Sequence, residues 1–208
     1  FLGGFQGQLG TAYGCFWRLM DLVKAMPRKV KRAPTEAQLP ARLKLCLMTS
    51  FLARLSSIIN VGFKYVKTPG QSAMNAAVSY NLNNAITGTS PDFSIDFPKL
   101  MFSKGRLPLP PGITATAGAG SVIEFEWKEP IPGTPNGSPN DKVTFIVYNQ
   151  QTQQLVVLDG AIKRSQLEFE LMLPPPFVGD TVHCFITFVG TDGKSVSDSV
   201  YITETIVV

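Results

Sequence analysis

The first seventeen residues alternate between apolar side chains and small or polar ones. The odd positions carry most of the larger side chains: Phe1, Phe5, Leu9, Tyr13, Cys15 and Trp17. A period of two is typical of a strand with one apolar face. Five glycines among the first 14 residues weaken a strand but permit another backbone to approach closely. The pattern predicts an N-terminal strand or hairpin. Residues 18–27 also fit a helical period, and we favour a second strand there.

Two helices are expected in the middle of the chain. Residues 35–38 read Thr-Glu-Ala-Gln, a capping-box signature. An amphipathic stripe follows at spacings of three and four: Leu39, Leu43, Leu47, Phe51, Leu55 and Ile58. It predicts a helix over about 35–61, although Pro40 moves the start of the continuous helix to about Leu39. A second helix is expected over about 72–87, closed by Gly88.

The pattern changes after residue 106. Residues 92–97 and 99–105 still alternate like short strands, and then 107–112 reads "LPLPPG", whose prolines favour an extended linker. Residues 113–208 hold six or seven short alternating runs separated by turn signals, which predict an antiparallel β-sandwich of the immunoglobulin or fibronectin type. The candidate core residues are Trp127, Phe145, Val147, Phe169, Leu171, Phe185 and Phe188. The expected class is therefore α+β, with a basic region over 1–106 and a sandwich over 113–208.

Charge is unevenly distributed along the chain. Residues 1–110 contain 14 Lys and Arg against 4 Asp and Glu, whereas residues 111–208 contain 5 against 11. The first part is therefore basic by +10 and the second acidic by −6. This asymmetry allows the basic part of one copy to meet the acidic part of another, or to meet an external polyanion.

Composition excludes several classes of protein. A hydrophobic content of 44% supports a packed core and argues against intrinsic disorder. No apolar run approaches the roughly 18 residues that a membrane-spanning helix needs. The three cysteines form no CxxC or Cys/His spacing, so we expect neither a metal site nor a disulfide framework.

Enzymatic chemistry has little support in the sequence. The one histidine, His183, lies in an alternating run that puts it opposite Cys184, so a structural or surface role is favoured over a catalytic one. Carboxylates occur two residues apart in two predicted strands, where solvation explains them: Glu124 with Glu126, and Glu168 with Glu170. We therefore expect a non-enzymatic protein with no catalytic, cofactor-binding or metal-binding residues.

A basic run precedes the first helix. It consists of Arg28, Lys29, Lys31 and Arg32. The nearest aromatic residues are Trp17 and Phe51, so sequence-specific recognition of nucleic acid is not expected. Three readings stay open: a solvated connector, which we favour, contact with an acidic protein surface, and salt-dependent attraction to a polyanion.

Five stretches occur in order along nearly the whole chain: "GGFQGQLGTAYG", "PTEAQLPARLKL", "SYNLNNAITG", "DKVTFIVYN" and "GDTVHCFITFVGTDGKSVSDSVYI". Together they resemble a family of uncharacterised proteins from Bacteroidota, known only as a domain of unknown function. The resemblance implies a bacterial source. It also implies a glycine-rich N-terminal strand, a helical middle and an immunoglobulin-like sandwich. It implies no activity and no binding residues.

The function expected is structural. The apolar side chains of Phe1, Phe5 and Leu9 must be covered, either by the chain's own sheet or by the sheet edge of a neighbouring subunit. We expect a self-associating subunit of a cell-surface or extracellular assembly, a homo-oligomer or a filament. The alternative is a binding module for an anionic polymer or glycan, in which exposed Tyr148 and Tyr201 stack on sugar rings.

Overall fold

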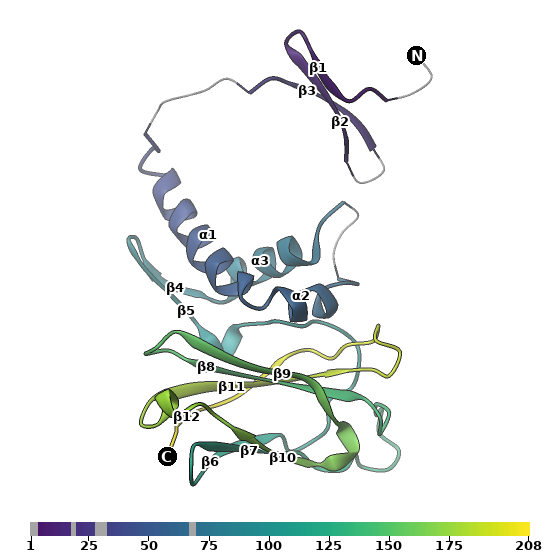
Figure 1. Cartoon of the computed structure of the whole chain (residues 1–208), viewed down its shortest axis with the longest axis vertical. Helices are drawn as coiled ribbons and strands as arrows, with labels where there is room; N and C mark the ends of the chain where they lie inside the picture. Colours follow the sequence, from purple (N-terminus) through teal and green to yellow (C-terminus); the bar gives the residue numbers. More distant parts are fainter. Residues whose placement is uncertain (1–3, 18–19, 28–32, 67–69) are drawn as a thin grey trace. The chain divides into compact units, whose positions relative to one another are not determined.

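The chain divides into two units, Phe1–Leu39 and Pro40–Val208. The computed structural model describes residues 4–17, 20–27, 33–66 and 70–208. Within these ranges the expected α+β class is confirmed, with three helices and several antiparallel sheets (Figure 1). The helices are α1 (Gln38–Ala53), α2 (Ser56–Gly62) and α3 (Ala73–Asn84).

The N-terminal unit is a three-stranded antiparallel sheet in the order β1-β2-β3. Its strands are β1 (Gly7–Leu9), β2 (Ala12–Trp17) and β3 (Met20–Ala25). A turn at Gly10, where φ is +58°, places Leu9 opposite Ala12 and Gln8 opposite Tyr13. Leu9 and Tyr13 therefore lie on opposite faces. The single run of odd positions is in fact two strands, and the second strand expected over 18–27 is confirmed as β3.

The helix expected over 35–61 is two helices, α1 and α2, which meet at a bend of 93°. Gln38 begins α1, and its side-chain Oε1 accepts a hydrogen bond from the Thr35 N–H at 3.3 Å, as a capping box requires. The last turn tightens where the N–H of Leu55 donates to the carbonyl of Leu52 at 2.9 Å. The bend follows that turn and lets both helices bury side chains in one core.

The second expected helix is confirmed as α3 and is shorter than expected. Ser72 caps it by accepting a hydrogen bond from the Asn75 N–H at 3.1 Å. The predicted end at Gly88 is wrong, because Gly88 lies in β4 (Ile86–Thr89), which pairs with β5 (Asp92–Ile95). Its φ of +90° suits glycine, and a Cβ there would collide with the carbonyl of Asp92.

Two antiparallel sheets pack face to face after residue 113. A three-stranded sheet in the order β10-β7-β6 faces a four-stranded sheet in the order β12-β11-β8-β9 (Figure 1). Their strands are β6 (Thr114–Gly118), β7 (Val122–Glu126), β8 (Lys142–Asn149), β9 (Gln154–Lys163), β10 (Glu168–Met172), β11 (Thr181–Val189) and β12 (Val200–Ile206). Most of the expected core residues are buried between the sheets: Trp127, Phe145, Val147, Leu171 and Phe188.

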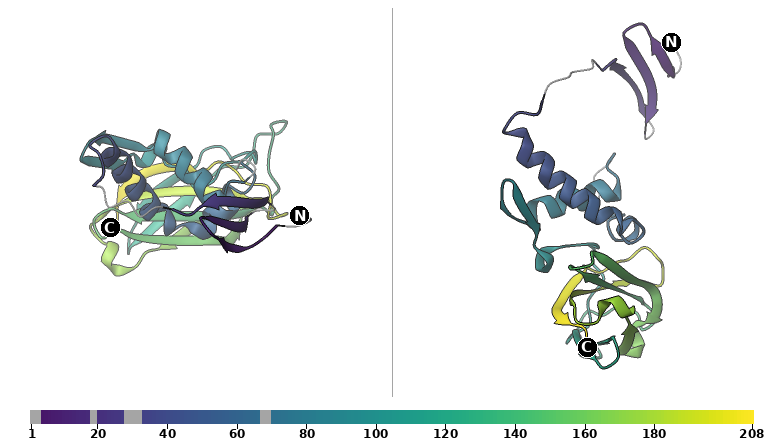
Figure 2. Two further views of the ribbon diagram at one scale, coloured as in Figure 1. Left: turned by 90° about the horizontal axis from the view of Figure 1, so that it is seen from above. Right: turned by 60° about the vertical axis from the view of Figure 1, so that its left-hand side comes forward.

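The two central strands of the four-stranded sheet, β8 and β11, are buried on both faces. Alternation along β8 sends Phe145 and Val147 toward the other sheet and sends Ile146 and Tyr148 toward the helices. Phe185 of β11 also faces the helices, so it belongs to the helical core and not to the sandwich core where it was expected. The helices therefore form a third layer over this sheet (Figures 1 and 2).

The segment 107–112, expected to be a linker, lies inside the unit Pro40–Val208. The Leu107 N–H donates to the carbonyl of Val196 at 3.0 Å, and buried Arg164 donates to the carbonyl of Pro108 at 2.6 Å. The strand expected over 99–105 is wrong, since Phe97–Lys99 is a 3-10 turn and extended chain without a ladder follows. The self-contained alternation after the linker also predicts that residues 112–208 fold alone, and that stays a prediction.

Candidate interaction surfaces

The described part of the N-terminal sheet has almost no buried side chains. Gly14 is the one residue in it that is buried. Of the expected interaction residues, Phe5 is 42% exposed and Leu9 is 69% exposed. Six further large hydrophobic side chains are exposed: Tyr13, Phe16, Trp17, Met20, Val23 and Met26. The other expected residues, Phe1 and the basic run Arg28, Lys29, Lys31 and Arg32, lie outside the described residues.

The pairing register assigns these side chains to two faces. Leu9 pairs with Ala12, and Gly7 and Val23 flank Gly14, so one face combines large apolar side chains with small residues. The ring of Phe5 covers Gly14, where a Cβ would collide with it. Asp21, which pairs with Phe16, lies at one end of this otherwise apolar face. Tyr13, Trp17 and Met20 lie on the other face. An exposed apolar face suits contact with another apolar surface.

A basic groove of about 720 Å³ lies in the unit Pro40–Val208. We define it by Tyr65, Val66, residues 104–108 and residues 194–196. Lys104, Arg106 and Lys194 supply its positive charge, and Lys64 lies with its Nζ 5.5 Å from the centre of the Tyr65 ring. These residues come from segments far apart in the sequence. The Lys64-Tyr65 neighbourhood is the one local signal that could have suggested the groove.

His183 is buried, with 4% of its surface exposed, so its structural interpretation is supported. Its ring stacks on Phe97 at a centroid distance of 4.0 Å. Its two nitrogens lie 3.3 Å from the hydroxyl of Tyr201 and 3.2 Å from the amide oxygen of Gln150. Burial lowers the pKa of His183 below its ordinary value. These contacts hold a neutral imidazole in the layer between helices and sheet.

The tyrosines expected to stack on sugars do not form an exposed platform. Tyr148 is buried, and its ring packs edge-on against Phe51 at 5.0 Å. Tyr201 is half-buried and pairs with His183. Burial raises the pKa of both phenols. That expectation is wrong for Tyr148, and Tyr201 contributes to the core.

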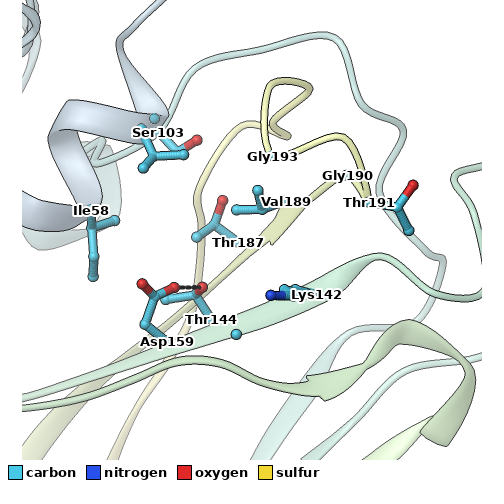
Figure 3. A pocket seen from close by; sticks show the side chains of 13 residues that line it. Ile58, Ser103, Lys142, Thr144, Asp159, Thr187, Val189, Gly190, Thr191 and Gly193 are labelled. Atoms are coloured by element: carbon cyan, nitrogen blue, oxygen red, sulfur yellow. Dashed lines mark hydrogen bonds between the residues drawn. The ribbon is translucent and has the colours of Figure 1, made fainter.

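A cavity of about 260 Å³ lies between α2 and the four-stranded sheet (Figure 3). The Thr144 hydroxyl donates to the Asp159 carboxylate at 2.7 Å, and Lys142 lies on the same wall. Asp159 lies in a β-bulge of β9, where the register with β8 shifts and the next residue, Gly160, has a φ of +62°. Buried Ser103 donates its hydroxyl to the carbonyl of Ser197 at 2.7 Å. These internal hydrogen bonds account for Thr144, Asp159 and Ser103 as parts of the fold.

The outer face of the three-stranded sheet is acidic, as the alternation predicted. Glu126 lies directly opposite Glu168, and Glu124 lies directly opposite Glu170. Like charges at directly opposite positions destabilise a sheet. No group of three or more His, Cys, Asp or Glu side chains in the described ranges is placed to hold a metal ion.

These features define an α+β protein with a two-sheet core, a helical layer on one sheet and a small apolar N-terminal sheet. The chain belongs to DUF6266, a family of unknown function, whose model matches residues 4–203. A search of the curated proteins finds no match. Over the described residues no single helix is long and apolar enough to span a membrane. The bent pair α1 and α2 reaches that length and composition only together. Six of its residues are buried: Met48, Phe51, Leu52, Ile58, Ile59 and Gly62.

Proposed function

We propose that this protein is a non-enzymatic structural subunit that self-associates through its N-terminal sheet. The observation that supports the proposal is the exposure of eight large hydrophobic side chains on a sheet in which only Gly14 is buried among the described residues. A small sheet needs a covered hydrophobic face for stability in water. Covering one such side chain completely contributes roughly 1.5–3 kcal/mol, so a partner surface is strongly favoured.

A second copy of the chain is the partner that charge favours. Residues 1–39 carry 6 Lys and Arg against 2 Asp and Glu, whereas residues 111–208 are acidic by −6. The basic unit of one copy can therefore approach the acidic sheets of another. The strands β1 and β3 are the edges of the sheet, and an edge can accept or supply a further strand. A contact of this head-to-tail kind builds rings or filaments.

The test compares charges placed on the two faces of the sheet. Leu9→Lys combined with Val23→Lys puts two charges on the face that holds Gly14. Gln8→Lys puts one charge on the other face, which carries Tyr13, Trp17 and Met20, and so tests which face makes the contact. Light scattering coupled to size-exclusion chromatography gives the mass, and thermal unfolding gives the stability. We expect the wild type and the Gln8→Lys variant to self-associate. The Leu9→Lys, Val23→Lys double variant should be folded but monomeric.

Two results would contradict self-association. One is a wild type that stays monomeric at all concentrations. The other is a double variant with a lower melting temperature and an unchanged mass, which would mean that the chain covers its own sheet. Replacing Arg28, Lys29, Lys31 and Arg32 by Gln tests the electrostatic part, since its effect should match that of added salt, which screens charges beyond about 8–10 Å.

Three finer statements belong to the same proposal. The strand order β10-β7-β6 against β12-β11-β8-β9 supports a fibronectin-like or immunoglobulin-like sandwich. Localisation at the cell surface or outside the cell is consistent with the role of an assembly subunit. The resemblance of the five quoted stretches supports a source in Bacteroidota.

A further inference from the structure

Between described residues, no ion pair joins a cation of the basic groove to a carboxylate, although the nearby charge of Lys194 helps to lower the pKa of Asp192. The ion pairs between described residues join Lys99 to Asp96 and Arg164 to Asp141, and neither uses a groove cation. Two further carboxylates, Asp192 and Asp198, lie in the neighbouring loop, and both accept hydrogen bonds from backbone N–H groups. Asp192 accepts hydrogen bonds from the N–H groups of Lys194 and Ser195 and from the Ser195 hydroxyl, which together lower its pKa. The Asp198 carboxylate accepts a hydrogen bond from the N–H of Gly105 at 2.9 Å.

The ammonium and guanidinium groups of Lys104, Arg106 and Lys194 are therefore available to an anion. Lys104 also lies with its Nζ 4.2 Å from the centre of the Tyr80 ring, which fixes its direction without removing its charge. Charge-assisted hydrogen bonds from such groups are the strong ones in anion recognition.

One wall of the groove is held in place by hydrogen bonding and close packing. Residues 104–108 and 194–196 run side by side, joined by the hydrogen bond from the Leu107 N–H to the Val196 carbonyl at 3.0 Å. Gly105 lies so close to this partner segment that a Cβ would collide with the Val196 carbonyl. A rigid groove loses little conformational entropy when it binds a ligand.

Apolar surface adjoins the positive charge. Tyr65 is 59% exposed, and Val66 and Pro108 also line the groove. An aromatic ring offers an apolar face with a polar edge, which suits the C–H face and hydroxyl groups of a sugar ring. Cations beside it suit carboxylate or sulfate groups on the same sugar.

The overall charge favours a short ligand over a nucleic acid. Residues 40–208 carry 13 Lys and Arg and 13 Asp and Glu, so the unit has no net charge. A protein that tracks a nucleic-acid backbone needs an extended basic face and several stacking aromatics. We propose that the basic groove binds an acidic oligosaccharide, with Lys104, Arg106 and Lys194 holding its carboxylate or sulfate groups and Tyr65 contacting a sugar face.

Binding of defined oligosaccharides to the full chain tests the proposal. The probes are a heparin hexasaccharide, an oligogalacturonate and neutral cellohexaose, measured by titration calorimetry at about 0.15 M salt. We expect both acidic probes to bind at least tenfold more tightly than cellohexaose. Arg106→Gln with Lys194→Gln should weaken binding by about tenfold for each cation removed.

Matched variants separate the groove from general charge. Lys128→Gln with Lys163→Gln removes two exposed cations elsewhere on the unit and should leave binding unchanged. Tyr65→Ala should weaken binding while preserving its dependence on salt. Lys194→Gln alone, in an exposed loop, serves if the double groove variant does not fold.

Three outcomes would overturn the proposal. They are no binding of either acidic probe, an equal loss in the Lys128/Lys163 control, and tighter groove-dependent binding of an oligothymidylate or of phosphatidylserine vesicles. The proposal is independent of self-association, because the groove residues all belong to Pro40–Val208. Leu9→Lys with Val23→Lys should therefore abolish assembly and leave oligosaccharide affinity unchanged.

Discussion

Truncation of Phe51 tests whether the helices and the two sheets form one cooperative unit. The side chain is 7% exposed, and its ring lies 5.0 Å from Tyr148 of β8, 6.4 Å from Phe102 and 6.1 Å from Phe97. Phe51→Ala removes a buried aromatic ring and leaves a cavity among three other rings. Such a change costs about 3–5 kcal/mol, a large part of the roughly 5–15 kcal/mol that stabilises a domain.

Leu45→Ala is the matched control on the same helix. Leu45 is 47% exposed, so its truncation should cost less than about 1 kcal/mol. Urea unfolding is followed by two signals in a Trp17→Phe background: helical circular dichroism and the fluorescence of Trp127, which is buried between the sheets. We expect both signals to move together to lower urea in Phe51→Ala.

A different result would refute this reasoning. If the helical signal moves and the Trp127 signal stays at the wild-type midpoint, the sheets fold without the helices. The boundary expected at residues 107–112 would then be a true folding boundary. If neither signal moves, Phe51 does not link α1 to β8 in solution.

Three further predictions concern single side chains. Glu126→Lys opposite Glu168 replaces a like-charge pair by an attractive one, so the free energy of unfolding should rise by about 0.5–1 kcal/mol and the gain should shrink in salt; an unchanged urea midpoint would contradict it. Burial lowers the pKa of His183 in the native state. As pH falls through about 6.5, the histidine of the unfolded chain therefore binds a proton while that of the native state stays neutral, and the unfolded state is stabilised. Wild type should therefore lose stability between pH 7 and 5 more steeply than His183→Gln, and parallel curves would exclude this contribution. Burial raises the pKa of Cys184 to about 12, so a thiol reagent should modify exposed Cys46 at once and Cys184 only as the protein unfolds; fast labelling of native Cys184 would disprove that burial.

Local pattern was sufficient for most of the elements. Six of the strands after residue 113 were predictable, because apolar alternation and turn residues are properties of neighbouring positions. The missed strand, β6, reads "TATAG" and carries little apolar contrast. The break between α1 and α2 was also missed, because both sides continue one apolar stripe. Only the tertiary core decides that Leu55 and Ile58 bury around a bend.

The candidate surfaces divide in the same way. The apolar character of the N-terminal segment was evident from Phe5 and Leu9. The single apolar face expected from the odd positions was not correct, because the turn after Leu9 places Leu9 and Tyr13 on opposite faces of the sheet. In the sequence only the Lys64-Tyr65 pair could have indicated the basic groove, because the groove depends on distant segments that bring Tyr65 and Lys194 to line it together.

By itself the sequence determined the class of the protein, the alternation of its strands and the basic-to-acidic asymmetry of its two parts. These follow from composition and from the periods of helix and strand, which act over a few residues. Only the tertiary structure decided that β8 and β11 are covered on both faces, with Tyr148 and His183 buried beneath the helices. Burial depends on which distant segments pack together, and that packing is a property of the whole chain.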